Sequence, residues 1–160
     1  MSAEIRKQRL RRLDFVLVRS PIYFVTACTQ NRRNILATPA IHKTFLRFGK
    51  KGPLHGAWVG AYVVMPDHLH VFLSTDDEKI AISAWMKSLK NTVSKILHAN
   101  GVAPPYWQKT FFDHLLRSSE SYSEKWNYVR ENPVRAGLVG KAEDWPYMGE
   151  IFTLEYHSRK

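Results

Sequence analysis

The sequence contains a single cysteine among its 160 residues, and it has no long apolar run. One cysteine, Cys28, excludes an intramolecular disulfide and is typical of a protein from a reducing compartment. The longest apolar stretch, residues 57–65, has nine residues, whereas a helix needs about 20 to span a bilayer. The first residues contain no apolar core of a secretory signal. We therefore expect a cytoplasmic protein that acts without a membrane partner.

Acidic residues are scarce relative to basic ones. Fourteen Asp and Glu stand against 24 Lys and Arg, which gives a formal net charge of +10. This excess favours a polyanionic partner, and nucleic acid is the better candidate because no membrane segment is present. A basic arm over residues 1–20 has, as its alternative interpretation, a frayed and solvated terminus. The candidate phosphate contacts in this arm and in the first polar loop are Arg6, Lys7, Arg9, Arg11, Arg12, Arg32 and Arg33.

The order of the predicted elements indicates a single α+β domain. Strand-forming segments are predicted at residues 22–29, 57–65, 68–75 and 106–118, and helices at residues 38–52, 79–99 and 121–132. Thr38 and Pro39 supply start signals for the first helix, and Ser121 with Glu124 resembles a capping box for the last. This order is that of a ferredoxin-like antiparallel sheet sandwich with an appended helix, over residues 21–140. We expect residues 141–160 to form a tail that packs on the domain.

Two histidines interrupt the apolar segment "VVMPDHLHVFLS" at residues 63–74. Side chains alternate between the two faces of a strand, so Leu69 points toward the covering helices while His68 and His70 share the other face. Their spacing of roughly 6.5–7 Å along the backbone allows two neutral imidazoles to converge on one cation. The alternative is an ordinary pair of histidines on a solvent-facing strand.

A tyrosine and an asparagine stand four residues apart near the end of the last predicted helix. Tyr128 and Asn132 would therefore share one helix face, and together they could supply a nucleophile and a third metal ligand. The alternatives are a half-buried structural tyrosine and a residue placed next to Pro133 for backbone reasons. Glu131 is a reserve ligand, about 100° round the helix from Asn132.

Three separated segments resemble the REP-associated tyrosine transposases, which belong to the single-tyrosine branch of the HUH nucleases. The segments are "MPDHLH", "WQKTFFDHLLRS" and "YVRENPVRAGLV", and the resemblance runs from residue 23 to residue 139. Leu69 fills the bulky apolar position between the two histidines of the signature. The resemblance implies that Tyr128 is the nucleophile and that Asn132 joins His68 and His70 as a metal ligand. Asp113 and His114 match a further signature, for which we expect a supporting role near the site.

This resemblance implies that the protein cleaves single-stranded DNA through a covalent 5′-phosphotyrosine and leaves a free 3′-OH. Mg²⁺ or Mn²⁺ would be the cofactor, the DNA would contain REP-type hairpin repeats, and the reaction would serve DNA transposition and recombination. Because one phosphodiester is exchanged for another, the step needs no ATP and can be reversed as strand transfer. The protein would act as a monomer or a homodimer. Exposed members of an aromatic set could stack on bases, and this set is Trp58, Tyr106, Trp107 and Trp126.

Two other functions remain open at this point. A metal-dependent phosphodiesterase would use water as the nucleophile, and Tyr128 would only pack. A domesticated nucleic-acid-binding protein would keep the fold without catalysis, although such a protein has no need for His68, His70, Tyr128 and Asn132 together.

Overall fold

The computed structural model describes residues 15–18 and 22–156. Its strands are β1 (Phe15–Val18), β2 (Ile22–Cys28), β3 (Ala57–Val64), β4 (His68–Thr75), β5 (Phe112–Leu116), β6 (Met148–Glu150) and β7 (Thr153–Tyr156). Its α-helices are α2 (Pro39–Lys51), α3 (Ile82–Ala99), α4 (Ser119–Val129) and α5 (Asn132–Arg135). Short 3₁₀ turns are η1 (Gln30–Arg32), η2 (Gly52–His55) and η3 (Ala142–Asp144). Within the described ranges, no helix is both long and apolar enough to cross a membrane.

The main sheet has five strands in the order β5-β2-β4-β3-β6, and every neighbouring pair is antiparallel. A separate parallel pair is formed by β1 and β7. Strand β2 pairs with β4 on one side and with β5 on the other, so the sheet joins segments that lie far apart in the sequence. This arrangement confirms the predicted α+β fold with an antiparallel sheet.

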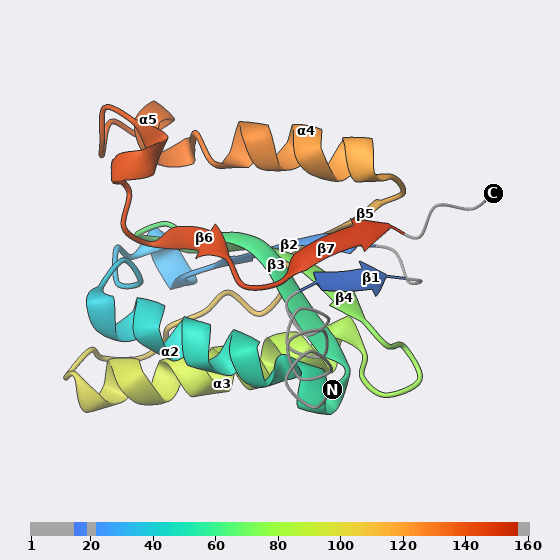
Figure 1. The fold of residues 1–160 in the computed structure, drawn as a ribbon. Coiled ribbons are helices and arrows are strands. Elements are labelled where there is room, and N and C mark those ends of the chain that lie inside the picture. Colours follow the sequence, from blue (N-terminus) through green and yellow to red (C-terminus); the bar gives the residue numbers. More distant parts are fainter. Residues whose placement is uncertain (1–14, 19–21, 157–160) are drawn as a thin grey trace, which may run out of the picture.

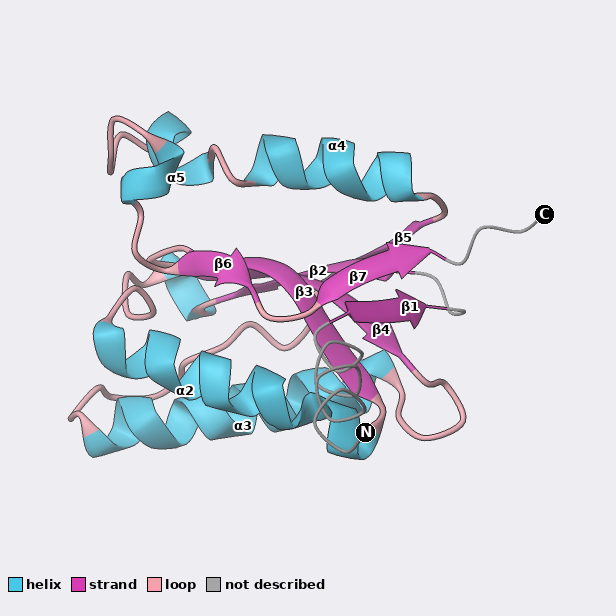
Figure 2. Cartoon of the chain, viewed as in Figure 1, coloured by secondary structure: helices cyan, strands magenta, loops and turns pink. Residues whose placement is uncertain are grey.

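Helices cover both faces of the sheet and make a three-layer molecule (Figure 1; Figure 2). Helices α2 and α3 lie on one face, and α4 lies on the other. The main core forms between the sheet and α2 and α3, and it includes Phe45, Trp85 and Val71. A second core forms under α4, where Phe72 packs against Tyr122 with ring centroids 4.8 Å apart. The face that carries the histidines is thus covered by α4 rather than left open.

The sequence signals at the start of α2 are confirmed. The hydroxyl of Thr38 accepts a hydrogen bond from the backbone N–H of Ile41, and Pro39 occupies the first helical position. Helix α3 begins at Ile82, three residues later than predicted, because residues 76–80 form a turn closed on the carbonyl of Asp76.

The prediction for the last helix was wrong at both ends. The N-cap is Ser118, whose hydroxyl accepts a hydrogen bond from the N–H of Ser121, so Ser121 lies inside the first turn and forms no capping box with Glu124. Helix α4 ends at Val129, and Asn132 opens the separate helix α5. Pro133 has no N–H to offer the carbonyl of Val129, which explains the interruption.

The predicted fourth strand was too long, and the chain ends add strands that the sequence did not indicate. Only Phe112–Leu116 forms β5, while the segment before it is a loop tied to β2 by the hydrogen bond from the N–H of Gln108 to the carbonyl of Cys28. Residues 15–18 of the expected basic arm form β1. In the expected tail, β6 joins the sheet beside β3, and the indole N–H of Trp145 donates to the carbonyl of Val64.

Helix α4 is fixed to the sheet by a buried hydrogen bond. A register shift in β3 between Val59 and Tyr62 leaves the N–H of Ala61 free to donate to the hydroxyl of Tyr122, 3.0 Å away. The neighbouring Gly60 allows this approach, because a Cβ there would lie 2.6 Å from the same hydroxyl. The bond therefore sets the height of α4 above the sheet.

We expect Tyr122→Phe to lower the free energy of unfolding by about 1–3 kcal/mol, because it leaves the buried N–H of Ala61 without a partner. Urea denaturation measures this change. Tyr128→Phe is the matched control, since Tyr128 is exposed and its hydroxyl makes no hydrogen bond within the described residues. Equal stability of the two variants would show that the Tyr122 bond does not hold α4.

Candidate functional site

The two histidines of β4 face each other on the α4 side of the sheet. Leu69, between them, points into the main core on the opposite face, as the alternation of the strand predicts. The imidazole centroids of His68 and His70 lie 4.7 Å apart at an interplanar angle of 75°. The structure therefore brings together the pair that the sequence predicted, in one small space.

Each histidine is held by a hydrogen bond at Nδ1. His70 Nδ1 lies 2.7 Å from the hydroxyl of Thr26, its cross-strand partner on β2. His68 Nδ1 lies 2.7 Å from a carboxylate oxygen of Asp67, so this nitrogen carries a proton and donates it. Within the described residues, neither Nε2 atom makes a hydrogen bond. Both rings thus keep one nitrogen available on the shared face.

Asp67 is the centre of a charged network beside His68. Arg32 Nε donates to its second carboxylate oxygen at 2.8 Å. Burial by itself raises the pKa of Asp67, but the hydrogen bonds from His68 and Arg32 outweigh it and lower the pKa below its ordinary value. The carboxylate is therefore charged at neutral pH and orients the imidazole of His68.

Arg32 reaches Asp67 from an unusual backbone conformation. Asn31 and Arg32 both have positive φ, at 58° and 52°, a region that side chains other than Asn and Asp rarely adopt. The turn is fixed because Thr29 donates its backbone N–H and its hydroxyl to the carbonyl of Asp67. Strain of this kind persists where the surrounding contacts over-determine the backbone, as they do next to this histidine pair.

His70 is neutral in the folded protein. Burial lowers the pKa of His70 to about 3, and the neighbouring His68, Lys125 and Arg32 act in the same direction. Its ring also stacks on Phe24, with centroids 5.0 Å apart and an interplanar angle of 23°. A half-buried neutral imidazole held at Nδ1 has the properties of a metal-ligating histidine.

Tyr128 lies on α4, which covers the histidine face. Its side chain is 62% exposed. Lys125 lies between Tyr128 and the histidine face. Its Nζ is 6.0 Å from the centroid of the Tyr128 ring and 4.8 Å from the centroid of the Phe24 ring, and Phe24 stacks on His70. Tyr128, Lys125 and His114 also line a shallow pocket of about 270 Å³. The nucleophile candidate thus lies on the histidine side of the sheet and is accessible to a large substrate.

Asn132 is joined to Tyr128 through Arg135. The guanidinium of Arg135 lies 4.0 Å from the centroid of the Tyr128 ring, and its Nη2 donates to the carbonyl of Tyr128 at 2.7 Å. The same Nη2 donates to Oδ1 of Asn132. Although α4 ends between them, Tyr128 and Asn132 therefore both contact the side chain of Arg135. No described hydrogen bond joins Asn132 to either histidine, and its role as a ligand stays a prediction.

The other predicted site residues have different surroundings. His114 faces Tyr128, whereas Asp113 lies on the opposite face of β5, close enough to Tyr23 to raise its pKa after the larger effects of burial and Asp77. Glu131 is the N-cap residue of α5, where its backbone carbonyl accepts the N–H of Arg135 and its carboxylate makes no capping hydrogen bond.

The predicted phosphate contacts are only partly described. Arg33 donates to the carbonyls of Ala103 and Pro105 and so fixes a loop. Arg32 contacts Asp67, yet its side chain remains 52% exposed. The arm residues lie outside the described residues, and they are Arg6, Lys7, Arg9, Arg11 and Arg12.

The aromatic residues suggested for base stacking pack against the protein instead. Trp58, Tyr106, Trp107 and Trp126 are all partly buried against hydrophobic clusters. Phe112 was missed, and its side chain is 68% exposed. It pairs with Thr26 across β2 and β5, so it lies at the sheet edge on the histidine face.

Sequence reasoning also missed the residues that orient the site. Asp67 had a usable signal, because a ligating histidine commonly donates its other ring N–H to a carboxylate, and Asp67 directly precedes His68. Thr26, Lys125 and Arg135 had none, since their contacts depend on strand register and on how α4 is placed.

Comparison with known proteins agrees with this geometry. Residues 18–131 match the family described as "Transposase IS200 like", and the match covers most of the chain, so the chain belongs to this family. The REP-associated tyrosine transposase of Escherichia coli K12 is 26% identical over 133 residues, which are 81% of this chain and 76% of that protein.

Solved structures show the same fold. The structure of a REP-associated tyrosine transposase bound to a REP hairpin superposes with a TM-score of 0.67 at 26% identity, covering 83% of this chain and 78% of that one. A crystal structure from Deinococcus radiodurans has a TM-score of 0.50 at 18% identity, covering 71% of this chain and 92% of that one, and supports the fold alone.

We expect acid to destabilise the metal-free protein through His70. An unfolded histidine takes up a proton near pH 6.5, whereas folded His70 stays neutral down to about pH 3. The unfolded state therefore binds more protons in this window, and stability falls as the pH falls from 6.5 toward 3, by at most about 1.4 kcal/mol per pH unit.

Urea denaturation in EDTA at several pH values measures this slope. His70→Asn is expected to show a shallower slope than the unmodified protein. His42, whose pKa is also lowered by burial, is present in both proteins and cancels in the difference. Parallel pH profiles would contradict the assignment of a neutral His70.

Proposed function

We propose that this member of the IS200-like transposase family cleaves and rejoins single-stranded DNA at REP-type hairpins, with Tyr128 as the nucleophile. The observation that carries the proposal is the arrangement of the site: two oriented histidines on one face of the sheet, and an exposed tyrosine on the helix that covers this face. The choice of DNA follows the relative that was solved with a REP hairpin. The protein would act on such a substrate in the cytoplasm.

The donor set fits a divalent cation such as Mg²⁺ or Mn²⁺. Nε2 of His68 and Nε2 of His70 would bind it, because both Nδ1 atoms are already engaged and His70 is neutral. Oδ1 of Asn132 would be the third ligand, and an amide oxygen has a second lone pair beyond the one used by Arg135. When bound, such an ion supplies a Lewis acid for the scissile phosphate.

Tyr128 would attack the phosphorus atom through its phenolic oxygen. The phenol loses its proton to solvent, which the exposed position of the side chain permits, and the new oxygen–phosphorus bond makes a 5′-phosphotyrosine. The bond from phosphorus to the 3′-oxygen breaks, and this oxygen leaves and takes up a proton as the free 3′-OH. Attack by another 3′-OH reverses the step and joins two strands.

Two cationic side chains beside Tyr128 would support this reaction. Arg135 and Lys125 lie over or near the tyrosine ring, and Arg135 also fixes the backbone at Tyr128. Cations held in place before the reaction stabilise an anionic phosphodiester and the charge that develops on it. Phe112, exposed at the sheet edge, would stack on a base, and such stacking contributes about 1–3 kcal/mol per base.

We further propose that Tyr128 serves the histidines of its own subunit. Helix α4 packs on the sheet of the same chain through Phe72 and through the buried bond between Tyr122 and Ala61. A monomer would then contain a complete site, and a homodimer would hold two independent ones.

We expect a covalent protein–DNA adduct that depends on Tyr128. Labelled hairpins from repeats next to the gene are mixed with the protein and Mn²⁺ and run on a denaturing protein gel. A shifted labelled band is expected for the unmodified protein and for Tyr147→Phe, a control tyrosine outside the site. The band is expected to be absent in Tyr128→Phe and in EDTA.

The other outcomes of this experiment are informative. Cleavage of the hairpin without a labelled band would contradict the covalent mechanism and favour hydrolysis by water. Tight binding of the hairpin with neither cleavage nor adduct would favour a domesticated binding protein.

We expect Asp67→Asn to weaken binding of Mn²⁺ by about 10–100-fold, because the uncharged side chain no longer orients the imidazole of His68. Calorimetric titration of the DNA-free protein with Mn²⁺ measures the affinity directly. Asp113→Asn removes the same charge on the opposite face of the sheet and is expected to bind as the unmodified protein does. Equal losses in the two variants would point to a general electrostatic effect rather than to His68.

A further inference from the structure

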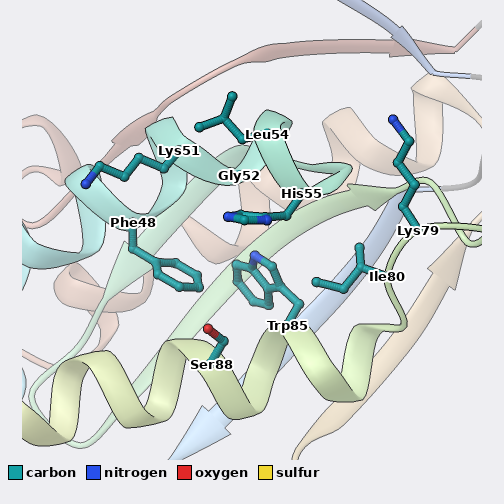
Figure 3. Close-up of a pocket in the computed structure, with 9 residues that line it drawn as sticks. All are labelled: Phe48, Lys51, Gly52, Leu54, His55, Lys79, Ile80, Trp85 and Ser88. Atoms are coloured by element: carbon teal, nitrogen blue, oxygen red, sulfur yellow. The ribbon is translucent and has the colours of Figure 1, made fainter.

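A second pocket lies far from the histidines, on the side of the sheet covered by α2 and α3. It has a volume of about 570 Å³, within the usual range for sites that bind a molecule of nucleotide size. Its wall is formed by the end of α2, η2, the turn before α3 and the first turns of α3 (Figure 3). His70 lies near the start of β4 and Thr75 is its last residue, roughly 17 Å further along the strand, and the turn that enters the pocket follows Thr75. The pocket is therefore separate from the site of Tyr128.

The lining of this pocket combines apolar surface with positive charge. Phe48, Trp85, Ile80 and Leu54 supply the apolar part, and Leu54 is 81% exposed. The titratable side chains of the lining are all basic, and none of the lining residues carries a carboxylate. These basic residues are Lys51, His55 and Lys79. In Figure 3, Lys51 and Lys79 stand at opposite sides of the opening. A planar apolar ligand that also carries negative charge fits this combination.

A buried hydrogen-bond donor in the pocket has no partner. Trp85 is only 2% exposed, and its indole Nε1 makes no hydrogen bond within the described part of the chain. A buried N–H without a partner costs free energy, so its presence calls for an explanation. In Figure 3 this nitrogen points toward the ring of His55, which is an exposed side chain on η2. Rotation of His55 would uncover a donor for a ligand.

We propose that this pocket binds a nucleotide. The base would lie against Phe48, Trp85 and Ile80 and would accept the indole N–H through a ring nitrogen or a carbonyl oxygen. The phosphate would be held by Lys51 or Lys79. We assign the nucleotide to an unpaired position of the DNA substrate, and this assignment rests on the proposed function.

The test follows the indole N–H signal of Trp85 by NMR. The signal is assigned from its loss in Trp85→Phe, and if that variant does not fold, from its shift in His55→Ala. The probes are dAMP, inorganic phosphate and a hairpin oligonucleotide with an unpaired loop. We expect dAMP and the hairpin to shift the signal and phosphate alone to leave it in place. A shift with dAMP but not with the hairpin would support the nucleotide site and reject the strand as its source.

Binding of the hairpin is then compared between variants. The double variant Lys51→Ala, Lys79→Ala is expected to lose about fivefold in affinity, because it removes whichever ammonium group holds the phosphate. Lys50→Ala is the matched control, because Lys50 is exposed on α2 and does not line the pocket. An unmoved signal with both nucleotide probes, or an equal shift with phosphate alone, would overturn the proposal.

The two proposals fail in different ways. Adduct formation at Tyr128 in the same samples reports on the proposed function alone. An adduct without any shift of the Trp85 signal would remove the pocket proposal only, whereas a shift with dAMP and no adduct with any hairpin would remove the proposed function only.

Discussion

The packing of α4 on the histidine face of the sheet is the constraint on which the rest of the site depends. The alternation of β4 gives that strand one face for the main core and one face for His68 and His70. Because α4 is held at a fixed height by Phe72 and by the bond from Ala61 to Tyr122, its far end carries Tyr128 to the same face. Gly60 is needed for this approach, since any side chain there would meet the helix.

The distribution of charge gives the side chains of the site different roles. Asp67 is kept anionic by Arg32 and His68, and it fixes the tautomer of one histidine, while burial keeps the other neutral. Lys125 and Arg135 place positive charge beside the tyrosine. The site thus offers a neutral imidazole at His70 and cations at Lys125 and Arg135, a combination that suits the binding of an anionic phosphodiester.

Local sequence patterns predicted many of the individual elements, but they did not predict the contacts between residues that lie far apart in the sequence. The period-two alternation at His68 and His70 and the cap at Thr38 depend on neighbours in sequence, and both were predicted correctly. The partnership of Thr26 with His70 depends on strand register, and that of Arg135 with Tyr128 depends on a break in the helix, which the sequence pattern did not locate. The start of α4 was misplaced because Ser118 and Ser121 are both good N-cap residues, and only tertiary packing decides between them.

The most direct test of the account is to find the residue that carries the DNA. Protein treated with hairpin DNA and Mn²⁺ is digested with nuclease and trypsin, and the peptides are analysed by mass spectrometry. Trypsin releases residues 126–130, a peptide whose one tyrosine is Tyr128. The account predicts that this peptide carries a nucleotide attached through phosphate. A nucleotide on a different tyrosine, or cleaved DNA with every tyrosine peptide unmodified, would contradict it.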